Sequence, residues 1–133
     1  MKKLELILKI IFIFFVSNCE KEKLDYREKY VGNWEFNVTR NEYYIGTIGD
    51  GYNKTDTIIY FGKIEYGNSK NEIKATYTKD DVIIFNLNDA GVLSYFVESY
   101  GGGKFENNNQ ISFYYRYGGG GGGGIHRVRG KKI

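Results

Sequence analysis

Apolar and polar side chains alternate along most of the chain after residue 30. Trp34, Phe36 and Val38 alternate with polar neighbours, which is the period of two expected of a β-strand with one buried face. The same pattern predicts a second strand over residues 41–48 and a long strand over residues 57–66. Further strands are expected over residues 73–78, 82–87, 92–98, around Phe105, and over residues 111–117 and 125–131.

Short turns rich in Gly, Asn and Asp separate these segments, and only residues 24–30 have the pattern of a helical turn, which we interpret as a short plug or cap. Eight or nine short strands without intervening helices favour an antiparallel meander, which has to hide its edges. We therefore predict one all-β domain over residues 30–133 that closes into a small barrel, with a β-sandwich as the alternative. The absence of Pro and the 13 Tyr suit such strands.

The first predicted strand opens with Val31-Gly32-Asn33-Trp34, directly after the helical turn. Gly32 and Trp34 form a Gly-x-Trp pattern that resembles the signature of the lipocalins. The chain is most similar to small bacterial lipocalin-like lipoproteins, over about residues 30–131. In lipocalins a basic residue of the last strand packs on the tryptophan ring, so the resemblance implies that Arg127 or Arg129 is a cation–π partner of Trp34.

The N-terminal 18 residues resemble a bacterial lipoprotein signal peptide. Lys2 and Lys3 precede a largely apolar run over residues 4–16, which is too short for a membrane-spanning helix of about 20 residues. Cys19, the single cysteine, follows as the predicted lipid attachment point. Residues 19–29 then form a charged tether and the helical turn. This predicts a lipid-anchored protein of the cell envelope, on the outer membrane, a periplasmic face or the surface, with a conventional secretory signal or an interfacial helix as alternatives.

Cleavage before Cys19 would remove 18 of 133 residues and leave 115, with a net charge lowered from +3 to about +1. A charge near zero and an export signal exclude nucleic acid as a partner. With one His, one Cys and no spacing typical of metal ligands, the sequence predicts no cofactor, no metal and no enzymatic activity. We interpret His126 as an exposed strand residue. The seven glycines at 118–124 predict a flexible hairpin loop, since they lack the Lys-Ser/Thr ending of a phosphate-binding loop.

The strands on both sides of the glycine run carry several cations. We predict that Tyr114, Arg116, Arg127 and Arg129 form a ligand or partner surface for an anionic molecule such as a lipid headgroup or an acidic glycan. Alternatively, these cations protect an edge strand against pairing with another chain. The leading functional hypothesis is a non-enzymatic, lipid-anchored envelope protein that binds a small ligand, glycan or partner protein through its barrel. The second is a structural or inhibitory protein that docks through the basic C-terminal hairpin.

Overall fold

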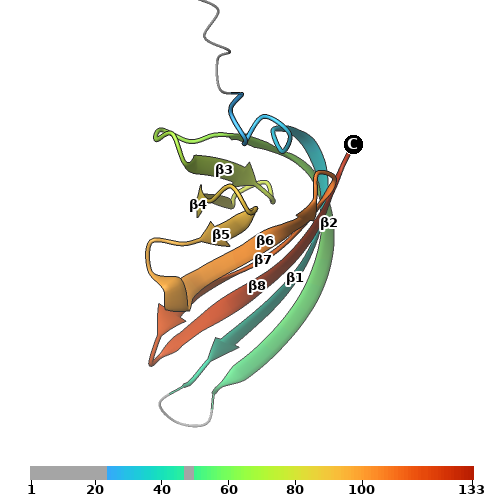
Figure 1. The fold of residues 1–133 in the computed structure, drawn as a ribbon. Coiled ribbons are helices and arrows are strands. Elements are labelled where there is room, and N and C mark those ends of the chain that lie inside the picture. Colours follow the sequence, from blue (N-terminus) through green and yellow to red (C-terminus); the bar gives the residue numbers. More distant parts are fainter. Residues whose placement is uncertain (1–23, 47–49) are drawn as a thin grey trace, which may run out of the picture.

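The computed structural model describes residues 24–46 and 50–133. Eight strands, each antiparallel to its neighbours, form one closed barrel in chain order (Figure 1). The all-β prediction is confirmed, as a barrel rather than a sandwich, and the architecture is consistent with a lipocalin-like barrel. No helix within the described ranges has the length and apolar character needed to cross a membrane. The strands are β1 (Gly32–Tyr44), β2 (Tyr52–Tyr66), β3 (Glu72–Thr76), β4 (Val82–Leu87), β5 (Val92–Ser94), β6 (Gly101–Asn107), β7 (Gln110–Gly119) and β8 (Gly122–Lys132).

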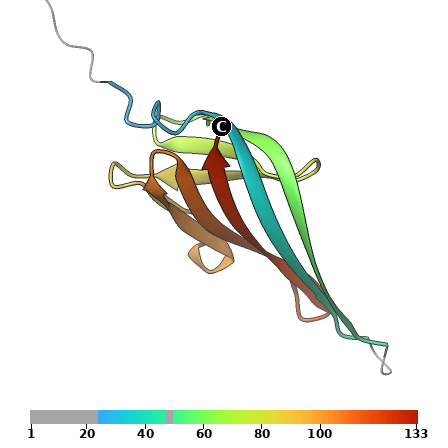
Figure 2. The ribbon, with the colours of Figure 1, turned by 90° about the vertical axis from the view of Figure 1, so that its right-hand side faces the viewer.

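The barrel closes where β1 pairs with β8, over a register that runs from Trp34 opposite Lys132 to Tyr44 opposite Gly122. β8 therefore has hydrogen-bonded neighbours on both sides, β1 and β7. The long strands β1, β2, β7 and β8 sweep down one wall, and β3, β4 and β5 are short (Figure 2). The prediction of a separate strand over residues 41–48 is wrong. The alternating pattern continues without a break, so β1 extends to Tyr44 and stays paired with both neighbours.

Two other predicted segments differ in length from the observed ones. The segment 92–98 contains only the short strand β5, after which a 3-10 turn, η1 (Glu98–Tyr100), leads into β6. The glycine run is mostly strand rather than a flexible loop, because Gly118 and Gly119 pair with Gly123 and Gly122. Only residues 120 and 121 make the turn. A Cβ at Gly123 would lie 2.2 Å from the Tyr117 carbonyl oxygen, so these strands need glycine for their close approach.

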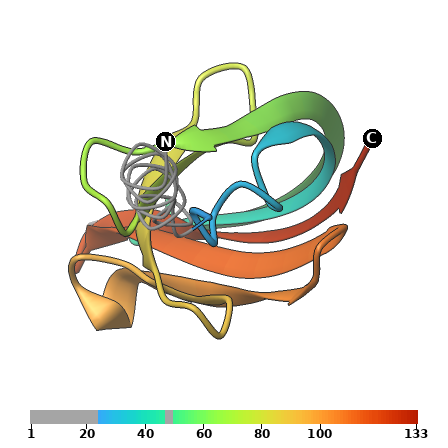
Figure 3. The same cartoon turned by 45° about the horizontal axis from the view of Figure 1, so that its top comes forward.

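One end of the barrel is closed by the turn that precedes β1. The Tyr30 and Val31 amides donate to the Arg27 carbonyl and complete the turn. The turn lies across the ring of strands (Figure 3). Tyr30 stacks on Phe105 of β6 at 3.7 Å between ring centroids, and the Tyr26 hydroxyl donates to the Leu87 carbonyl at 2.7 Å. The expected plug therefore forms, and it fixes the chain's entry into β1.

Apolar side chains from all eight strands fill the barrel next to this plug. Their burial follows the alternation in each strand, so every second residue points inward. The protein's own side chains therefore occupy the core of the barrel. The buried apolar residues are Tyr30, Trp34, Phe36, Val38, Ile64, Ile73, Ala75, Tyr77, Ile83, Phe85, Leu87, Leu93, Phe105, Ile111, Phe113 and Val128.

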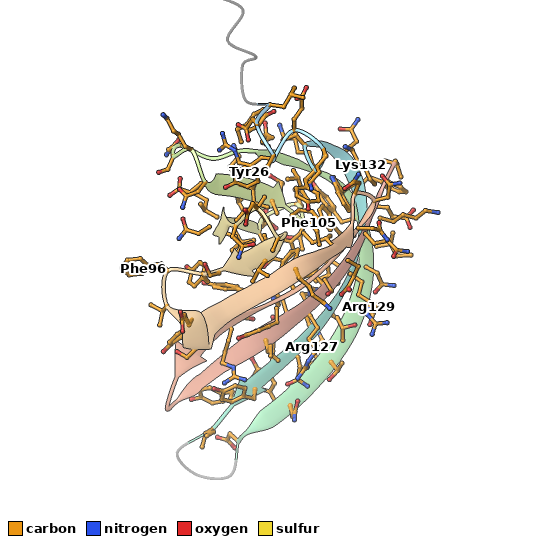
Figure 4. The ribbon with its side chains drawn as sticks, in the orientation of Figure 1. Tyr26, Phe96, Phe105, Arg127, Arg129 and Lys132 are labelled. Carbon is orange, nitrogen blue, oxygen red and sulfur yellow. The ribbon has the colours of Figure 1, made fainter. Side chains whose placement is uncertain are left out.

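Trp34 lies at the closed end, fully buried, and its indole Nε1 donates to the Tyr30 carbonyl at 2.9 Å. The prediction that Arg127 or Arg129 packs on its ring is wrong. Both arginines alternate with the buried Val128, so their side chains lie on the outer face of β8. Lys132 of β8 is the cation opposite Trp34 in the register (Figure 4), and a Cβ at Gly32 would lie 3.1 Å from its Cε. Its Nζ donates to the Lys29 carbonyl at 2.9 Å.

Candidate functional site

The inward face of β1 changes from apolar to charged between Val38 and Arg40. Val38 belongs to an apolar row that crosses the sheet with Ile58, Val128 and Phe113. The next inward row along the strands is polar. It consists of Asp56, Arg40, His126 and Tyr115, contributed by β2, β1, β8 and β7. The core therefore ends at the Val38 row, and the residues beyond it line the open end of the barrel.

We call this open end the mouth, a cavity of about 550 Å³ opposite the plug. Its size is within the range of small-molecule pockets. Two cations and three carboxylates line it together with three tyrosines and a histidine. The lining residues are Arg40, Glu42, Ile58, Tyr60, Thr78, Lys79, Asp80, Asp81, Tyr115, Tyr117 and His126.

Two polar pairs hold one wall of the mouth. The Arg40 guanidinium forms a two-pronged ion pair with Asp56, directly opposite on β2, with 2.9 Å between Arg40 Nε and Asp56 Oδ1. This contact holds the pKa of the Asp56 carboxyl below its usual value. The Tyr117 hydroxyl donates to Glu42 Oε1 at 3.1 Å. A Cβ at Gly124 would lie 2.6 Å from the Tyr117 Oη, so the Tyr117 ring occupies the space that a side chain at position 124 would fill.

His126 is buried, so the prediction of an exposed strand residue is wrong. It alternates with the outward-facing Arg127 and therefore shares the inner face with Val128. Its Nδ1 is 2.9 Å from the Tyr77 hydroxyl oxygen. Burial lowers the pKa of His126 below its ordinary value, opposed by the nearby Asp81 carboxylate, and burial also raises the pKa of the Tyr77 hydroxyl. At neutral pH both groups are therefore uncharged.

The hydrogen bond between these groups is linked to the tautomer of His126. The Tyr77 hydroxyl has no other hydrogen-bond partner within the described part of the chain. Either atom can be the donor in this contact, and in the tautomer in which the hydroxyl donates to Nδ1 the ring hydrogen is on Nε2. Nε2 has no partner among the described residues, and His126 lines the mouth. In that tautomer His126 offers the mouth one hydrogen-bond donor on a nearly buried ring.

Asp81 faces His126 from the turn between β3 and β4. The Thr78 hydroxyl accepts from the Asp81 amide at 2.8 Å and donates to Asp81 Oδ2 at 2.6 Å, which fixes the carboxylate. Asp81 Oδ2 is 4.0 Å from His126 Nδ1. The mouth therefore places the His126 ring beside a fixed acceptor, the carboxylate of Asp81, together with the rings of Tyr115 and Tyr117.

The four residues predicted as a ligand surface lie together, but on the outer face of the barrel rather than in the mouth. Tyr114 is opposite Arg127 in the register of β7 with β8, and Arg116 and Arg129 lie on the same face. With Thr39 and Gly102 they line a groove of about 1060 Å³, which we call the outer groove. Figure 4 shows Arg127 and Arg129 following one another along β8.

The remaining predicted site residues are structural or lie elsewhere. Gly32 and Trp34 sit at the closed end, far along β1 from Arg40. Cys19, the signal peptide and the charged tether up to residue 23 lie outside the described residues. Within residues 24–46 and 50–133, no three His, Cys, Asp or Glu side chains come together as metal ligands.

The residues of the mouth were not singled out from the sequence. Arg40 and Glu42 continue the inward alternation of Trp34, Phe36 and Val38, so the switch from apolar to charged side chains was a usable signal of an open barrel end. His126 alternates with Arg127 in the same way. The contacts of His126 with Tyr77 and Asp81 join β8 to the β3–β4 turn, and no local pattern in the sequence predicts such a contact.

The chain is thus an all-β protein with a closed eight-stranded antiparallel barrel, open and polar at one end. No protein-family model matches it, and no curated protein is significantly similar in sequence. Among solved structures, the S-type phycobiliprotein lyase CPES from Guillardia theta is similar, with 11% sequence identity and a TM-score of 0.37. The match covers 86% of this chain and 98% of the lyase.

This comparison contradicts the prediction that the protein is not an enzyme, because the similar barrel is named a lyase. The inventory of one His and one Cys was too narrow a basis for that prediction. Catalytic groups can also be carboxylates and tyrosines, and the mouth contains both. At this identity and TM-score the likeness gives this chain no activity of its own.

Proposed function

We propose that this protein is held to a bacterial envelope membrane by a lipid on Cys19 and that its mouth binds a small hydroxyl-bearing ligand, such as a saccharide. The closed barrel with one open end is compatible with small-ligand binding. The His126 ring beside the Asp81 carboxylate, with 4.0 Å between Asp81 Oδ2 and His126 Nδ1, is the observation that carries the choice of ligand class.

A hydroxyl group suits this pair because it accepts and donates at once. In the Nε2–H tautomer that we propose for His126, the hydroxyl group accepts from Nε2 and donates to the Asp81 carboxylate, so neither group of the mouth is left without a partner. Tyr115 and Tyr117 stack at 6.2 Å between ring centroids, at an angle of 28°. Their faces offer apolar surface to the C–H groups of a sugar, and their hydroxyls stay protonated because burial raises their pKa values.

The filled core sets the depth to which a ligand enters. Val38 and Val128 are buried in the row directly below Arg40 and His126, so a ligand rests on that row. It occupies the mouth rather than the barrel axis. A cavity of about 550 Å³ accepts one or two sugar units.

The ligand proposal is tested by calorimetry of the full chain against a panel of neutral mono- and disaccharides. We expect Asp81→Asn to weaken binding about tenfold, equal to about 1.4 kcal/mol. The matched control is Asp89→Asn, on an exposed turn at the other end of the barrel, which leaves the affinity unchanged. Equal effects of the two variants, or a panel without a binder, would contradict the proposal.

The anchor is tested separately, by intact-mass spectrometry of the membrane fraction. The sequence up to Cys19 supports a mature chain of residues 19–133 with a diacyl or triacyl group on the cysteine. Replacement of Cys19 by Ser should release the protein from the membrane. Recovery of the unmodified full-length chain from the cytosol would rule the anchor out.

A further inference from the structure

We propose that the outer groove is a second binding site, for a ligand that carries two or more phosphate groups. It is separate from the mouth, because its side chains alternate with the inward-facing ones along the same strands. Tyr114, Arg116, Arg127 and Arg129 point outward, whereas Tyr115, Tyr117, His126 and Val128 point inward. The proposal therefore does not depend on a ligand in the mouth.

The simplest structural explanation does not hold for the two arginines of β8. Cations on an edge strand prevent it from pairing with another chain. β8 is not an edge, because it is fully paired with β1 on one side and β7 on the other. The arginines of β8 therefore have no edge to protect.

The three arginines of the outer groove are close together and unpaired. Arg127 and Arg129 are two residues apart on one face of β8, which places their Cα atoms about 7 Å apart. Arg116 is opposite Ile125, and so it is a diagonal neighbour of Arg127, at about 7–8 Å. Within the described part of the chain, no carboxylate lies within 4.0 Å of these three guanidinium groups. Their mutual repulsion is unfavourable in the free protein and is relieved by an anion that spans them.

The shape of the groove supports the same ligand. Gly102 on β6 lies next to Tyr114 and leaves the floor open at that point. The Tyr114 hydroxyl donates to the Glu98 carbonyl at 3.3 Å, which holds the ring in place as a wall of the groove. Thr39 of β1 adds a hydroxyl on the opposite side of Arg127. Cations, a hydroxyl and an aromatic wall fit a phosphorylated polyol or headgroup.

Phosphate matches the three arginines better than isolated carboxylates do. Each guanidinium presents paired N–H donors that bind phosphate oxygens in a two-pronged manner. A phosphate monoester carries about 1.5 to 2 negative charges at neutral pH, so two groups balance three arginines. The phosphate can belong to a membrane lipid or to a soluble molecule, and the recognition chemistry is the same for both.

The experiment measures binding of the full chain with Cys19→Ser, which lacks the proposed lipid, to two probes. Tripolyphosphate represents the soluble source, measured by calorimetry, and vesicles of phosphatidylcholine with added cardiolipin represent the lipid source, measured by flotation against phosphatidylcholine alone. We expect Arg127→Gln to weaken binding about tenfold to whichever probe binds. Lys70→Gln, on an exposed turn between β2 and β3, removes the same charge far from the groove and should change binding less than about twofold.

A second variant distinguishes the effect of the shape of the outer groove from the effect of charge. A Cβ at Gly102 would meet its nearest atom, the Leu93 carbonyl oxygen, at 3.4 Å, which is an ordinary contact. Gly102→Leu therefore fills the floor at unchanged net charge, and it should weaken binding as well. Binding of tripolyphosphate supports a soluble ligand, and binding of cardiolipin vesicles alone supports a lipid. If neither probe binds, or if Arg127→Gln and Lys70→Gln weaken binding equally, the proposal is overturned.

Discussion

At the scale of single residues, two buried polar contacts lie on the inner face of the barrel. One stabilises the closed end and the other holds the wall of the mouth. Trp34 ties the barrel to its plug through one hydrogen bond to the Tyr30 carbonyl. His126 holds the wall of the mouth through the Tyr77 hydroxyl. Both side chains are almost fully buried, so each hydrogen bond has to be made, and losing one partner leaves the other unsatisfied.

We predict that Trp34→Phe lowers the free energy of unfolding by about 2 kcal/mol. The variant loses part of a buried ring and leaves the Tyr30 carbonyl without its donor. Urea unfolding followed by circular dichroism measures the change, since the single tryptophan is lost. Phe61→Leu, at a ring that is 66% exposed on β2, is the control and should stay within about 0.5 kcal/mol of the wild type. A similar effect of both variants would contradict the role of Trp34.

We predict that His126 makes the stability depend on pH in the mildly acidic range. Burial lowers its pKa in the folded state, with Asp81 and Glu42 opposing and Arg40 reinforcing the shift. Between that lowered pKa and the unfolded value of about 6.5, the unfolded chain binds more protons. The free energy of unfolding therefore falls as the pH falls from about 7 towards the lowered pKa of His126.

His126→Gln tests this, because the variant lacks the titrating group and should show a shallower fall in the free energy of unfolding over the same range. Asp56, whose pKa is lowered by Arg40, loses its contribution only at lower pH and does so in both proteins. Parallel curves for the two proteins would show that His126 does not titrate differently on folding.

At the scale of elements, the alternation of side chains predicted most of the strands, and the failures have one physical cause. A strand ends where the adjacent strands stop pairing with it, and the local sequence does not show which strands are adjacent. β1 extends through Tyr44 because both β2 and β8 accompany it. The glycine run forms strand because adjacent backbones approach closely there. The burial of His126 followed from alternation with Arg127, a signal that was present and was not used.

Glycines differ by position within the strands, and two of them form a matched pair for a test. A Cβ at Gly130 of β8 would lie 2.6 Å from Ile111 Cγ2 and 2.8 Å from Phe36 Cδ1, inside the core. We predict that Gly130→Ala overpacks the core and lowers the free energy of unfolding by about 1–3 kcal/mol, which lowers the melting temperature. A Cβ at Gly119 would meet nothing within 4 Å, so Gly119→Ala should be neutral or slightly stabilising. Calorimetric melting of both variants measures the difference, and the reverse order would contradict the packing of β8.

At the scale of the whole molecule, the barrel has one extensively paired strand boundary, between β1 and β8, and one weakly paired boundary, between β4 and β5, which we call the seam. β1 and β8 share eleven paired positions, whereas β4 and β5 share two. We predict that amide hydrogens of β5 exchange at least about ten times faster than those of the middle of β8, because little pairing has to open there. Hydrogen exchange followed by NMR or mass spectrometry measures this. Equal protection of both strands would mean that the seam is held by more than its ladder.

The sequence could predict a barrel and the cations on its outer face, since both depend on local alternation. It could not predict which strand completes the ring, and that pairing decides whether Arg127 and Arg129 guard an edge or line a groove. The mouth required the same information, because Arg40, His126 and Asp81 come from distant parts of the chain.

The most direct test of saccharide binding in the mouth is the NMR signal of the His126 side chain in the full protein, recorded during titration with the neutral saccharide panel. We predict a neutral imidazole at pH 7 with its hydrogen on Nε2. We also predict that a bound saccharide shifts the Nε2 resonance while the resonances of Arg127 and Arg129 on the outer face stay unchanged. A charged imidazole at that pH, or a Nε2 resonance that no saccharide moves, would contradict saccharide binding in the mouth.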